Sequence, residues 1–339
     1  MSPATTFPDK PKVLSLGYPT YAGEEYMKDF EEKVDLHILK ASDRKGTIAA
    51  VAAKVATDGP FDVLMVLMGY MGYMPFDAEF LSPLLPHLKL VVCASAGYNE
   101  FDIDWMTRNG IYFCNTRNAV SEATADMAIF LMLAVLRDTT RLEKCLRERI
   151  WRGGLAPTRD PSGLVLGIVG MGSIGKHIAR KAAVFNMKVK YYNRTRLLPK
   201  DEQIYQATYT SSLEELLRSA DVVSLSCPLN EKTAGMIGAK EFAQMKDGVF
   251  LINTSRGAVI DEDALIEALE SGKVEKAGLD VFHNEPKINP YFINSDRCIL
   301  QPHMGGLTDI AWKKAYQENM ENIKALFATG RPIAPVNSI

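Results

Sequence analysis

The sequence predicts an α/β protein built from two doubly wound parallel-sheet domains, and three observations lead to this fold class. Short aliphatic and β-branched runs alternate with segments of helical periodicity, which is typical of parallel strands covered by helices on both faces. A glycine-rich loop stands between one such run and the helical segment after it. A Gly/Pro-rich connection at 152–163 divides the series in two, and 339 residues suit two domains of about 100–200 residues each.

The first α/β series closes near residue 118. Its strand-like runs are "KVLSLG", "DLHIL", "FDVLMVL", "LKLVVCASAG" and "GIYFCN", with helical segments such as "AGEEYMKDFEEK" and "GTIAAVAAKVATDG" between them. After residue 306, "DIAWKKAYQENMENIKALFATG" has the pattern of one more long helix. We expect this helix to return to the first domain, so that residues 1–118 and 307–339 form one domain and 119–306 the other.

The second series begins after a long apolar helix predicted over about residues 120–148. Its strand-like runs are "LVLGIVG", "MKVKYY", "DVVSLS", "VFLIN", "KAGLDV" and "CILQPH". Ser212-x-x-Glu215 resembles a capping box at the start of one intervening helix, and Asp261 opens another that ends at Gly272. The second domain therefore also alternates strands with helices.

The composition argues against several classes of partner. A formal charge of −2 and a pI near 6.3 disfavour nucleic acid and anionic membrane surfaces. The N-terminus lacks the apolar core of a secretory signal, and the longest apolar run, 127–136, is far below the ~20 residues of a membrane span. The five cysteines are scattered without a C-x-x-C pair, so we expect a reduced, cytoplasmic protein with neither a disulfide framework nor a bound metal.

The loop at 170–175, Gly-Met-Gly-Ser-Ile-Gly, predicts a dinucleotide site. It follows the run "VLGIV" and opens a helical segment, which is the context that a G-x-G-x-x-G motif requires. Glycines there permit a tight turn and close approach of the backbone to a pyrophosphate, which faces the helix N-terminus. A P-loop is the competing interpretation, but His177 replaces the Ser or Thr that would bind Mg²⁺. The residues predicted to hold the pyrophosphate are Gly170, Gly172, Ser173, Ile174 and Gly175.

The end of the next strand indicates which cofactor the site prefers. An acidic residue is expected about 20 residues beyond the loop, where it binds the adenosine ribose hydroxyls. This chain has Asn193, Arg194 and Thr195 there instead. A guanidinium and two short hydrogen-bonding side chains favour a 2′-phosphate. The sequence therefore predicts NADP(H) in preference to NAD(H), with an ordinary solvated strand end as the alternative.

Three polar clusters, "NTSRGAVID", "GLDVFHNEP" and "QPHMGG", follow later strands of the second domain. Open α/β sheets bind ligands at the carboxyl ends of their strands, so Arg256, Glu285 and His303 should lie near the cofactor. They can supply what reduction of a 2-oxo acid needs: a cation that binds and polarises it, an acid that protonates the carbonyl oxygen, and a group that orients the acid. An ionised Glu285 would favour the proton-donating form of His303. A metal site is the alternative, without support from any cysteine; its ligands would be Asp280, His283, Glu285 and His303.

In this order, the glycine loop, "NTSRG", "GLDVFHNEP" and "QPHMGG" resemble the D-2-hydroxyacid dehydrogenase family over nearly the whole chain, including its NADP-dependent glyoxylate/hydroxypyruvate reductases and fungal D-mandelate dehydrogenases. The resemblance implies a flavodoxin-like substrate domain, a Rossmann cofactor domain and a homodimer assembled through the long helix. It implies Arg256 as the partner of the substrate carboxylate and carbonyl, with Glu285 and His303 as the proton-handling pair. Residues implied at the cofactor are Cys227, Pro228, Thr233, Thr254, Ser255, Asp280, His303 and Gly305, with Asp280 near the nicotinamide.

The resemblance extends to the substrate. The loop "SAGYNEFD" is similar to the family's carboxylate-binding loop, in which the backbone N–H groups of Ala96 and Gly97 would hold the acid and Ser95 stands where glycine is frequent. Bulky side chains at 68–74, with Tyr70 as a candidate substrate contact, leave two substrate classes open: glyoxylate or hydroxypyruvate, and a larger aromatic 2-oxo acid such as benzoylformate. The alternative function is that of a nicotinamide-nucleotide-sensing binding protein, because C-terminal-binding corepressors share this fold and retain an Arg/Glu/His set.

Overall fold

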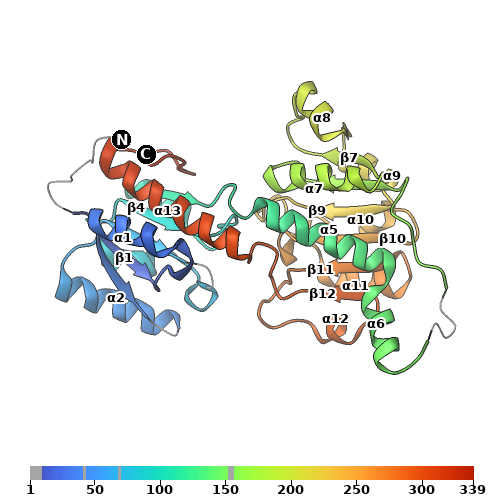
Figure 1. Cartoon of the computed structure of the whole chain (residues 1–339), viewed down its shortest axis with the longest axis horizontal. Coiled ribbons are helices and arrows are strands. Elements are labelled where there is room, and N and C mark those ends of the chain that lie inside the picture. Colours follow the sequence, from blue (N-terminus) through green and yellow to red (C-terminus); the bar gives the residue numbers. More distant parts are fainter. Residues whose placement is uncertain (1–9, 41–42, 68–69, 152–155) are drawn as a thin grey trace. The chain divides into compact units, whose positions relative to one another are not determined.

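The computed structural model describes residues 10–40, 43–67, 70–151 and 156–339, with the backbone alone described at 70 and 71. The chain divides into two compact units, one of Met1–Val120 with Leu307–Ile339 and the other of Ser121–Gly306 (Figure 1). Each unit contains one parallel β-sheet with helices on both faces. The predicted fold class, α/β with two doubly wound parallel sheets, is confirmed.

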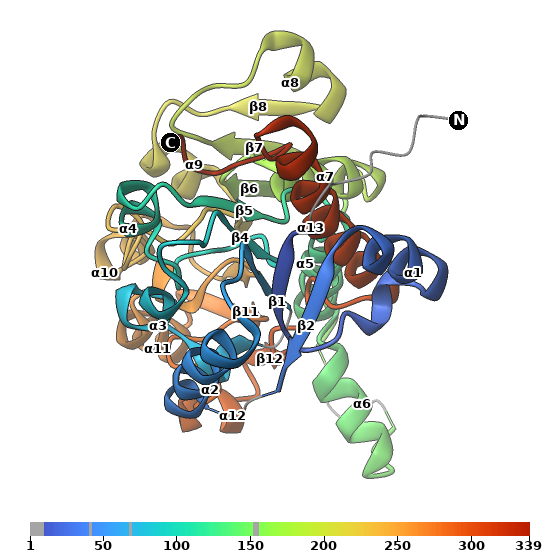
Figure 2. The same ribbon diagram turned by 90° about the vertical axis from the view of Figure 1, so that its left-hand side faces the viewer.

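The sheet of the first unit has the strand order β2-β1-β3-β4-β5, and all its pairs are parallel (Figure 2). This is the flavodoxin-like order. Its strands are β1 (Lys12–Leu16), β2 (Asp35–Leu39), β3 (Val63–Val66), β4 (Leu90–Cys93) and β5 (Tyr112–Asn115). β4 stops well short of the end of the run "LKLVVCASAG", so Ser95 to Gly97 lie beyond the strand.

Alternating side chains of these strands enter two separate cores, because successive residues of a strand point to opposite faces. Val13 and Met65 pack against α1 and α13, whereas Leu14 and Leu64 face α2, α3 and α4. Apolar residues on both faces explain why the strands appear in the sequence as continuous apolar runs. The helices are α1 (Glu24–Lys33), α2 (Arg44–Asp58), α3 (Ala78–Leu81), α4 (Ile103–Arg108) and α13 (Asp309–Thr329), with short 3-10 turns at Thr20–Ala22, Tyr70–Tyr73 and Ser82–Leu84.

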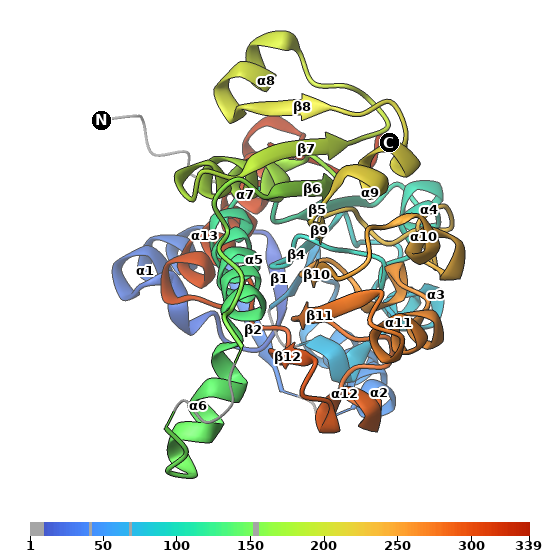
Figure 3. The same cartoon turned by 90° about the vertical axis from the view of Figure 1, so that its right-hand side faces the viewer.

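The sheet of the second unit has the order β12-β11-β10-β9-β6-β7-β8 and is also parallel throughout (Figure 3). The strand order reverses between β6 and β9. Doubly wound sheets bind their ligands at such a switch point. The strands are β6 (Val165–Val169), β7 (Lys188–Tyr192), β8 (Ala207–Tyr209), β9 (Val222–Leu225), β10 (Val249–Asn253), β11 (Val274–Leu279) and β12 (Cys298–Leu300). The sequence analysis did not predict β8, which is only three residues long.

Helices cover both faces of this second sheet. α5 and α7 pack on one face through a core that includes Leu131, Ile168 and Ile178, and α9 to α12 cover the other through Leu216, Phe242 and Leu265. No helix among the described residues is long and apolar enough to cross a membrane. The helices are α5 (Ser121–Arg137), α6 (Thr139–Arg147), α7 (Ser173–Val184), α8 (Pro199–Tyr205), α9 (Leu213–Ser219), α10 (Ala239–Gln244), α11 (Glu262–Glu270) and α12 (Pro290–Asn294), with a 3-10 turn at Gly257–Val259.

The single helix predicted over about 120–148 is wrong, because the chain breaks at Asp138 between α5 and α6. Asp138 has φ of 51°, in the left-handed region that ends a helix. Its buried carboxylate forms ion pairs with Arg141 of α6 and, at 3.0 Å, with Lys276 of β11. The residue at the break is therefore in contact with a strand more than a hundred residues away in the sequence.

Candidate active site

The glycine loop has the geometry of a phosphate cradle. Gly170 follows β6 with φ of +102°, and Gly172 caps the N-terminus of α7. A Cβ on Gly170 would lie 2.7 Å from Ser226 O, and one on Gly175 would lie 2.3 Å from Gly170 O, so neither position accepts a side chain. The first N–H groups of α7, which begins with Ser173 and Ile174, have no intrahelical acceptor and suit an anion.

Buried hydroxyl groups without partners lie at the ends of the neighbouring strands β9 and β10. Within the described part of the chain, Ser226 Oγ and Thr254 Oγ1 are buried and make no hydrogen bond. A buried polar atom left without a partner is costly, so this wall fits a ligand that has polar groups of its own. Burial raises the pKa of the Cys227 thiol to about 11, which keeps it neutral and unreactive beside Pro228. Together with the glycine loop, these residues fit a dinucleotide.

Thr233 has a local structural role in this wall. Its hydroxyl donates to Pro228 O at 2.6 Å and accepts from the Asn230 N–H at 2.9 Å. These bonds close the loop that follows β9. The Thr233 hydroxyl, which was predicted to contact the cofactor, is therefore already hydrogen bonded within the protein.

The loop after β7 presents an arginine to solvent. Arg194 is exposed, and no hydrogen bond or ion pair is recorded for it among the described residues. Asn193 Nδ2 donates to Thr195 O at 3.0 Å, which shapes the turn around Arg194. Arg196 is instead held by Glu202. Arg194 is thus the guanidinium in this loop that is available to an anionic ligand.

Glu285 and His303 form a close pair. His303 Nδ1 lies 2.7 Å from Glu285 Oε2, and the Phe282 N–H donates to Glu285 Oε1 at 2.8 Å. Burial raises the pKa of Glu285, but the hydrogen bond and charge of His303, the Phe282 N–H and the charge of Arg256 together outweigh burial and lower the pKa below the usual glutamate value. An ionised carboxylate can only accept, so Nδ1 carries a proton and Nε2 remains for a ligand.

Arg256 is placed beside this pair by a tight turn after β10. Asn253 Nδ2 donates to Arg256 O at 2.9 Å, while Asn253 Oδ1 accepts from both the N–H and the hydroxyl of Ser255. A Cβ on Gly257 would lie 2.0 Å from the carbonyl carbon of Phe282, so the turn packs directly on the segment that leads to Glu285. The sequence analysis missed the role of Asn253, although an Asn at the end of a buried strand is a recognisable turn signal.

Asp280 holds the turn that carries His303. Its main-chain carbonyl accepts from the His303 N–H at 2.8 Å, and its carboxylate accepts from the N–H groups of Met304 at 2.7 Å and Gly305 at 2.8 Å. These bonds stabilise His303 at φ of 55°, where a residue other than glycine is strained. Burial raises the pKa of Asp280 against the opposing effect of the two N–H donors. Asp280 therefore orients His303 through the backbone of the turn.

Three of the four residues named for the alternative metal site, Asp280, Glu285 and His303, make other contacts. Within the described ranges, no three His, Cys, Asp or Glu side chains are grouped as metal ligands are. Glu285 is paired with His303, and Asp280 accepts backbone N–H groups. The arrangement is that of a proton-transfer site beside a cation.

The predicted carboxylate-binding loop belongs to the first unit. The Thr116 N–H donates to Ser95 O at 3.0 Å, and Asn115 Nδ2 donates to Ala96 O at 2.6 Å. The N–H groups of Ala96 and Gly97 donate no recorded hydrogen bond within the described chain, so they suit a carboxylate. The side chain of the other predicted substrate contact, Tyr70, lies outside the described residues.

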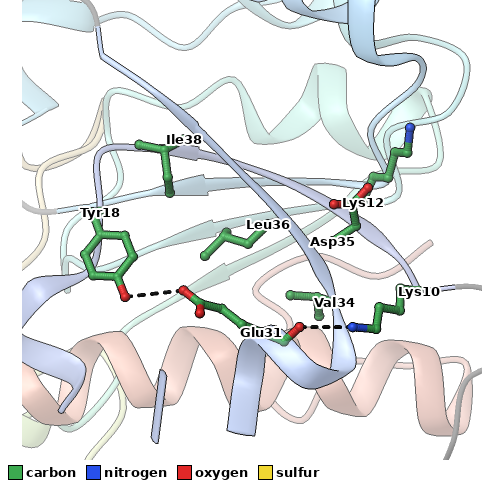
Figure 4. A pocket seen from close by; sticks show the side chains of 8 residues that line it. All are labelled: Lys10, Lys12, Tyr18, Glu31, Val34, Asp35, Leu36 and Ile38. Carbon is green, nitrogen blue, oxygen red and sulfur yellow. Dashed lines mark hydrogen bonds between the residues drawn. The ribbon is translucent and has the colours of Figure 1, made fainter. Parts of the chain in front are cut away.

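A separate pocket, unforeseen from the sequence, lies along β2 in the first unit (Figure 4). Val34, Leu36 and Ile38 are its apolar lining residues. Three of its polar lining residues are hydrogen bonded to one another, since Lys10 Nζ donates to Glu31 O at 3.2 Å and the Tyr18 hydroxyl to Glu31 Oε1 at 3.3 Å. All its lining residues belong to the first unit, whereas the Arg256, Glu285 and His303 site belongs to the second.

The second unit thus combines a phosphate-binding turn with an arginine and a carboxylate-oriented histidine, as in an oxidoreductase that uses a nicotinamide cofactor. Residues 129–305 match the family described as "D-isomer specific 2-hydroxyacid dehydrogenase, NAD binding domain". The chain belongs to the D-isomer specific 2-hydroxyacid dehydrogenase family.

Similar proteins support this assignment over the full length of the chain. "Dehydrogenase efuE" of Hormonema carpetanum is 58% identical over 339 residues, 100% of this chain and 84% of that protein. The crystal structure of a glyoxylate reductase from Paecilomyes thermophila is 36% identical, with a TM-score of 0.89 over 97% of this chain and 99% of the other. The holo form of Rhodotorula graminis D-mandelate dehydrogenase is 33% identical, with a TM-score of 0.90 over 97% and 98%.

Proposed function

We propose that this oxidoreductase reduces 2-oxo acids to D-2-hydroxy acids with NADPH as its preferred hydride donor. The observation that carries the proposal is the 2.7 Å pair of His303 Nδ1 and Glu285 Oε2, against which the turn that carries Arg256 is packed. A neutral substrate would not require this cation. A 2-oxo acid requires both the cation and a proton donor.

The protein's own residues supply charge and a proton. Arg256 binds the substrate through its guanidinium and polarises the carbonyl group. His303 donates its Nε2 proton to the carbonyl oxygen, while Glu285 keeps the imidazole ring in place and stabilises its charged form. The nicotinamide, when bound, supplies the hydride that reduces the carbonyl carbon. We assign the N–H groups of Ala96 and Gly97 to the substrate carboxylate.

Glu285→Gln is expected to shift the pH profile of reduction toward lower pH. Because the pKa of Glu285 is lowered, the carboxylate stays ionised as pH falls through the usual glutamate range, and the pair weakens only below it. A neutral glutamine no longer favours the charged imidazole. As pH rises, the variant should therefore lose activity at a lower pH than the wild type does. The measurement is kcat against pH for both proteins, and coincident profiles would contradict the assigned role.

Arg194→Ala is expected to weaken NADPH binding by about ten- to a hundredfold, because a charge-assisted hydrogen bond contributes about 1.5–3 kcal/mol. NADH has no 2′-phosphate and should be affected little. The measurement is KM for both cofactors. Lys200→Ala, which removes an exposed positive charge nearby on α8, is the matched control and should leave the ratio of the two values unchanged. Equal losses for NADPH and NADH would refute the phosphate contact.

The experiment that tests the function as a whole is a substrate panel. kcat/KM would be measured for glyoxylate, hydroxypyruvate, pyruvate, phenylpyruvate and benzoylformate with NADPH and NADH. Similarity to both a glyoxylate reductase and a D-mandelate dehydrogenase supports testing small and aromatic acids together. Absence of turnover with every acid would favour a nucleotide-sensing protein over an enzyme.

We further propose a homodimer. Support comes from exposed apolar side chains on and beside α5 and α6: Phe130 is 51% exposed, Leu146 58% and Trp151 73%. Such side chains, near each other in the sequence, are typical of a surface that another subunit covers.

A further inference from the structure

The loop between β7 and α8, residues 193–198, is held at its far end by two side chains that the sequence analysis did not single out. We propose that Tyr191 and Glu202 are positioning residues that preset this loop so that Arg194 meets the 2′-phosphate of NADP(H). The inference rests on the proposed preference for NADP(H). Figure 3 shows the strands and the helix involved, β7, β8 and α8, at one edge of the second sheet.

Tyr191 is the buried end of the arrangement. Its side chain is fully buried, although it lies next to the last residue of β7. The hydroxyl donates to Glu202 Oε1 at 2.7 Å and accepts from the Leu197 N–H at 2.9 Å. The Leu197 bond fixes the backbone three residues after Arg194 directly to the core of the unit.

Glu202 is the charged end. Its carboxylate accepts two hydrogen bonds from Arg196, Nε to Oε1 and Nη2 to Oε2, each at 2.8 Å. Hydrogen bonds from Arg196 and then Tyr191 lower the pKa of Glu202 to about 2, so the carboxylate is ionised near neutral pH. Such a two-pronged contact fixes the orientation of both side chains.

These bonds give the two arginines of the loop different roles. The charge of Arg196 is neutralised by Glu202, and its side chain contributes to the shape of the loop. Arg194 has no recorded partner in the described chain and retains its full charge. At the other end of the loop, Tyr192 O accepts from the Gly170 N–H at 3.0 Å, which ties β7 to the phosphate-binding turn.

A loop fixed at both ends loses less conformational freedom when a ligand binds. A preorganised arginine therefore binds the phosphate more tightly than the same arginine on a free loop. Loosening the loop should weaken NADPH and have much less effect on NADH, which makes no contact with Arg194. A purely structural role of Tyr191 and Glu202 would affect both cofactors alike.

Tyr191→Phe tests the inference, because it removes the hydroxyl and keeps the ring in the core. Loss of the two hydrogen bonds is expected to raise KM for NADPH by about two- to tenfold, with a much smaller change for NADH. The dissociation constant of adenosine 2′,5′-bisphosphate should rise by the same factor, and that of 5′-AMP should not. Tyr209→Phe is the matched control, since Tyr209 packs on the Tyr191 ring and no hydrogen bond of its hydroxyl is recorded in the described chain.

The double variant Arg194→Ala/Tyr191→Phe decides whether Tyr191 acts through Arg194. If it does, Tyr191→Phe causes no further loss of NADPH affinity once Arg194 is absent. An equal loss with and without Arg194 would overturn the inference and leave the proposed function intact. A wild-type protein without NADPH preference would instead refute the proposed function itself.

Glu202→Gln provides a second route if Tyr191→Phe does not fold. Glutamine retains an acceptor for the Tyr191 hydroxyl but loses the ion pair with Arg196, so the loop should loosen in the same direction. The ratio of KM for NADPH to KM for NADH should then rise. An unchanged ratio in a folded variant would overturn the inference.

Discussion

Replacing His303 with alanine is expected to lower kcat for 2-oxo acid reduction by about 10²–10⁴-fold, the range that general acids contribute. The structure gives the physical reason. Glu285 holds Nδ1 at 2.7 Å, and Asp280 holds the backbone of the turn, so that Nε2 is left to deliver the proton. Steady-state kinetics at saturating cofactor would measure the effect.

His87→Ala is a suitable control for this variant, because His87 is exposed in the first unit and no interaction is recorded for it within the described chain. Its kcat should equal that of the wild type. Thermal unfolding would establish that His303→Ala remains folded. If only KM changes in the His303 variant, the proton donor is another group.

The second large effect is expected at Arg256. Arg256→Gln should lower kcat/KM for 2-oxo acids by about 10²–10⁴-fold, because two charge-assisted hydrogen bonds of about 1.5–3 kcal/mol each are lost together. Both kcat and KM should suffer, since the guanidinium binds the acid and also stabilises charge that develops on the carbonyl oxygen. KM for the cofactor should change far less.

Two further variants make the Arg256 result specific. Arg256→Lys keeps the charge and loses the planar fork, so it should recover only part of the activity. Arg297→Gln removes an arginine from the amino end of β12, the opposite end of the sheet from His303, and should leave kcat/KM unchanged. A loss in Arg297→Gln equal to that in Arg256→Gln would show that general charge, and not the site, is responsible.

The sequence was sufficient to predict most strands of the second unit and the glycine turn between β6 and α7. Strands buried on both faces appear as continuous apolar runs, and a turn that admits no Cβ requires glycine, so β6, the glycine loop and α7 could be predicted from local pattern alone. Polar residues directly after β10, β11 and β12 also had to lie at one edge, because parallel strands share the direction of their carboxyl ends. Arg256, Glu285 and His303 were predicted as one site for that reason.

Other features depend on partners that no local pattern identifies. The break between α5 and α6 falls at Asp138, whose carboxylate pairs with Lys276 of a distant strand. The hydroxyl of Tyr191 and the carboxylate of Glu202 are eleven residues apart and meet because α8 folds back beside β7. β8 is too short to form a distinct apolar run.

The sequence by itself determined the fold class, the glycine turn and the chemical types at the site, because these follow from periodicity, from steric demands on single residues and from the polarity of strand ends. Only the tertiary structure decided which nitrogen of His303 contacts Glu285 and that Asp280 stabilises the turn carrying His303. It also decided that Arg196 forms an ion pair with Glu202, whereas no ion pair is recorded for Arg194 in the described chain. Each of these contacts joins residues that are far apart in the chain or lie in different elements. Such contacts arise from the packing of the elements, which the spacing of residues in the sequence does not specify.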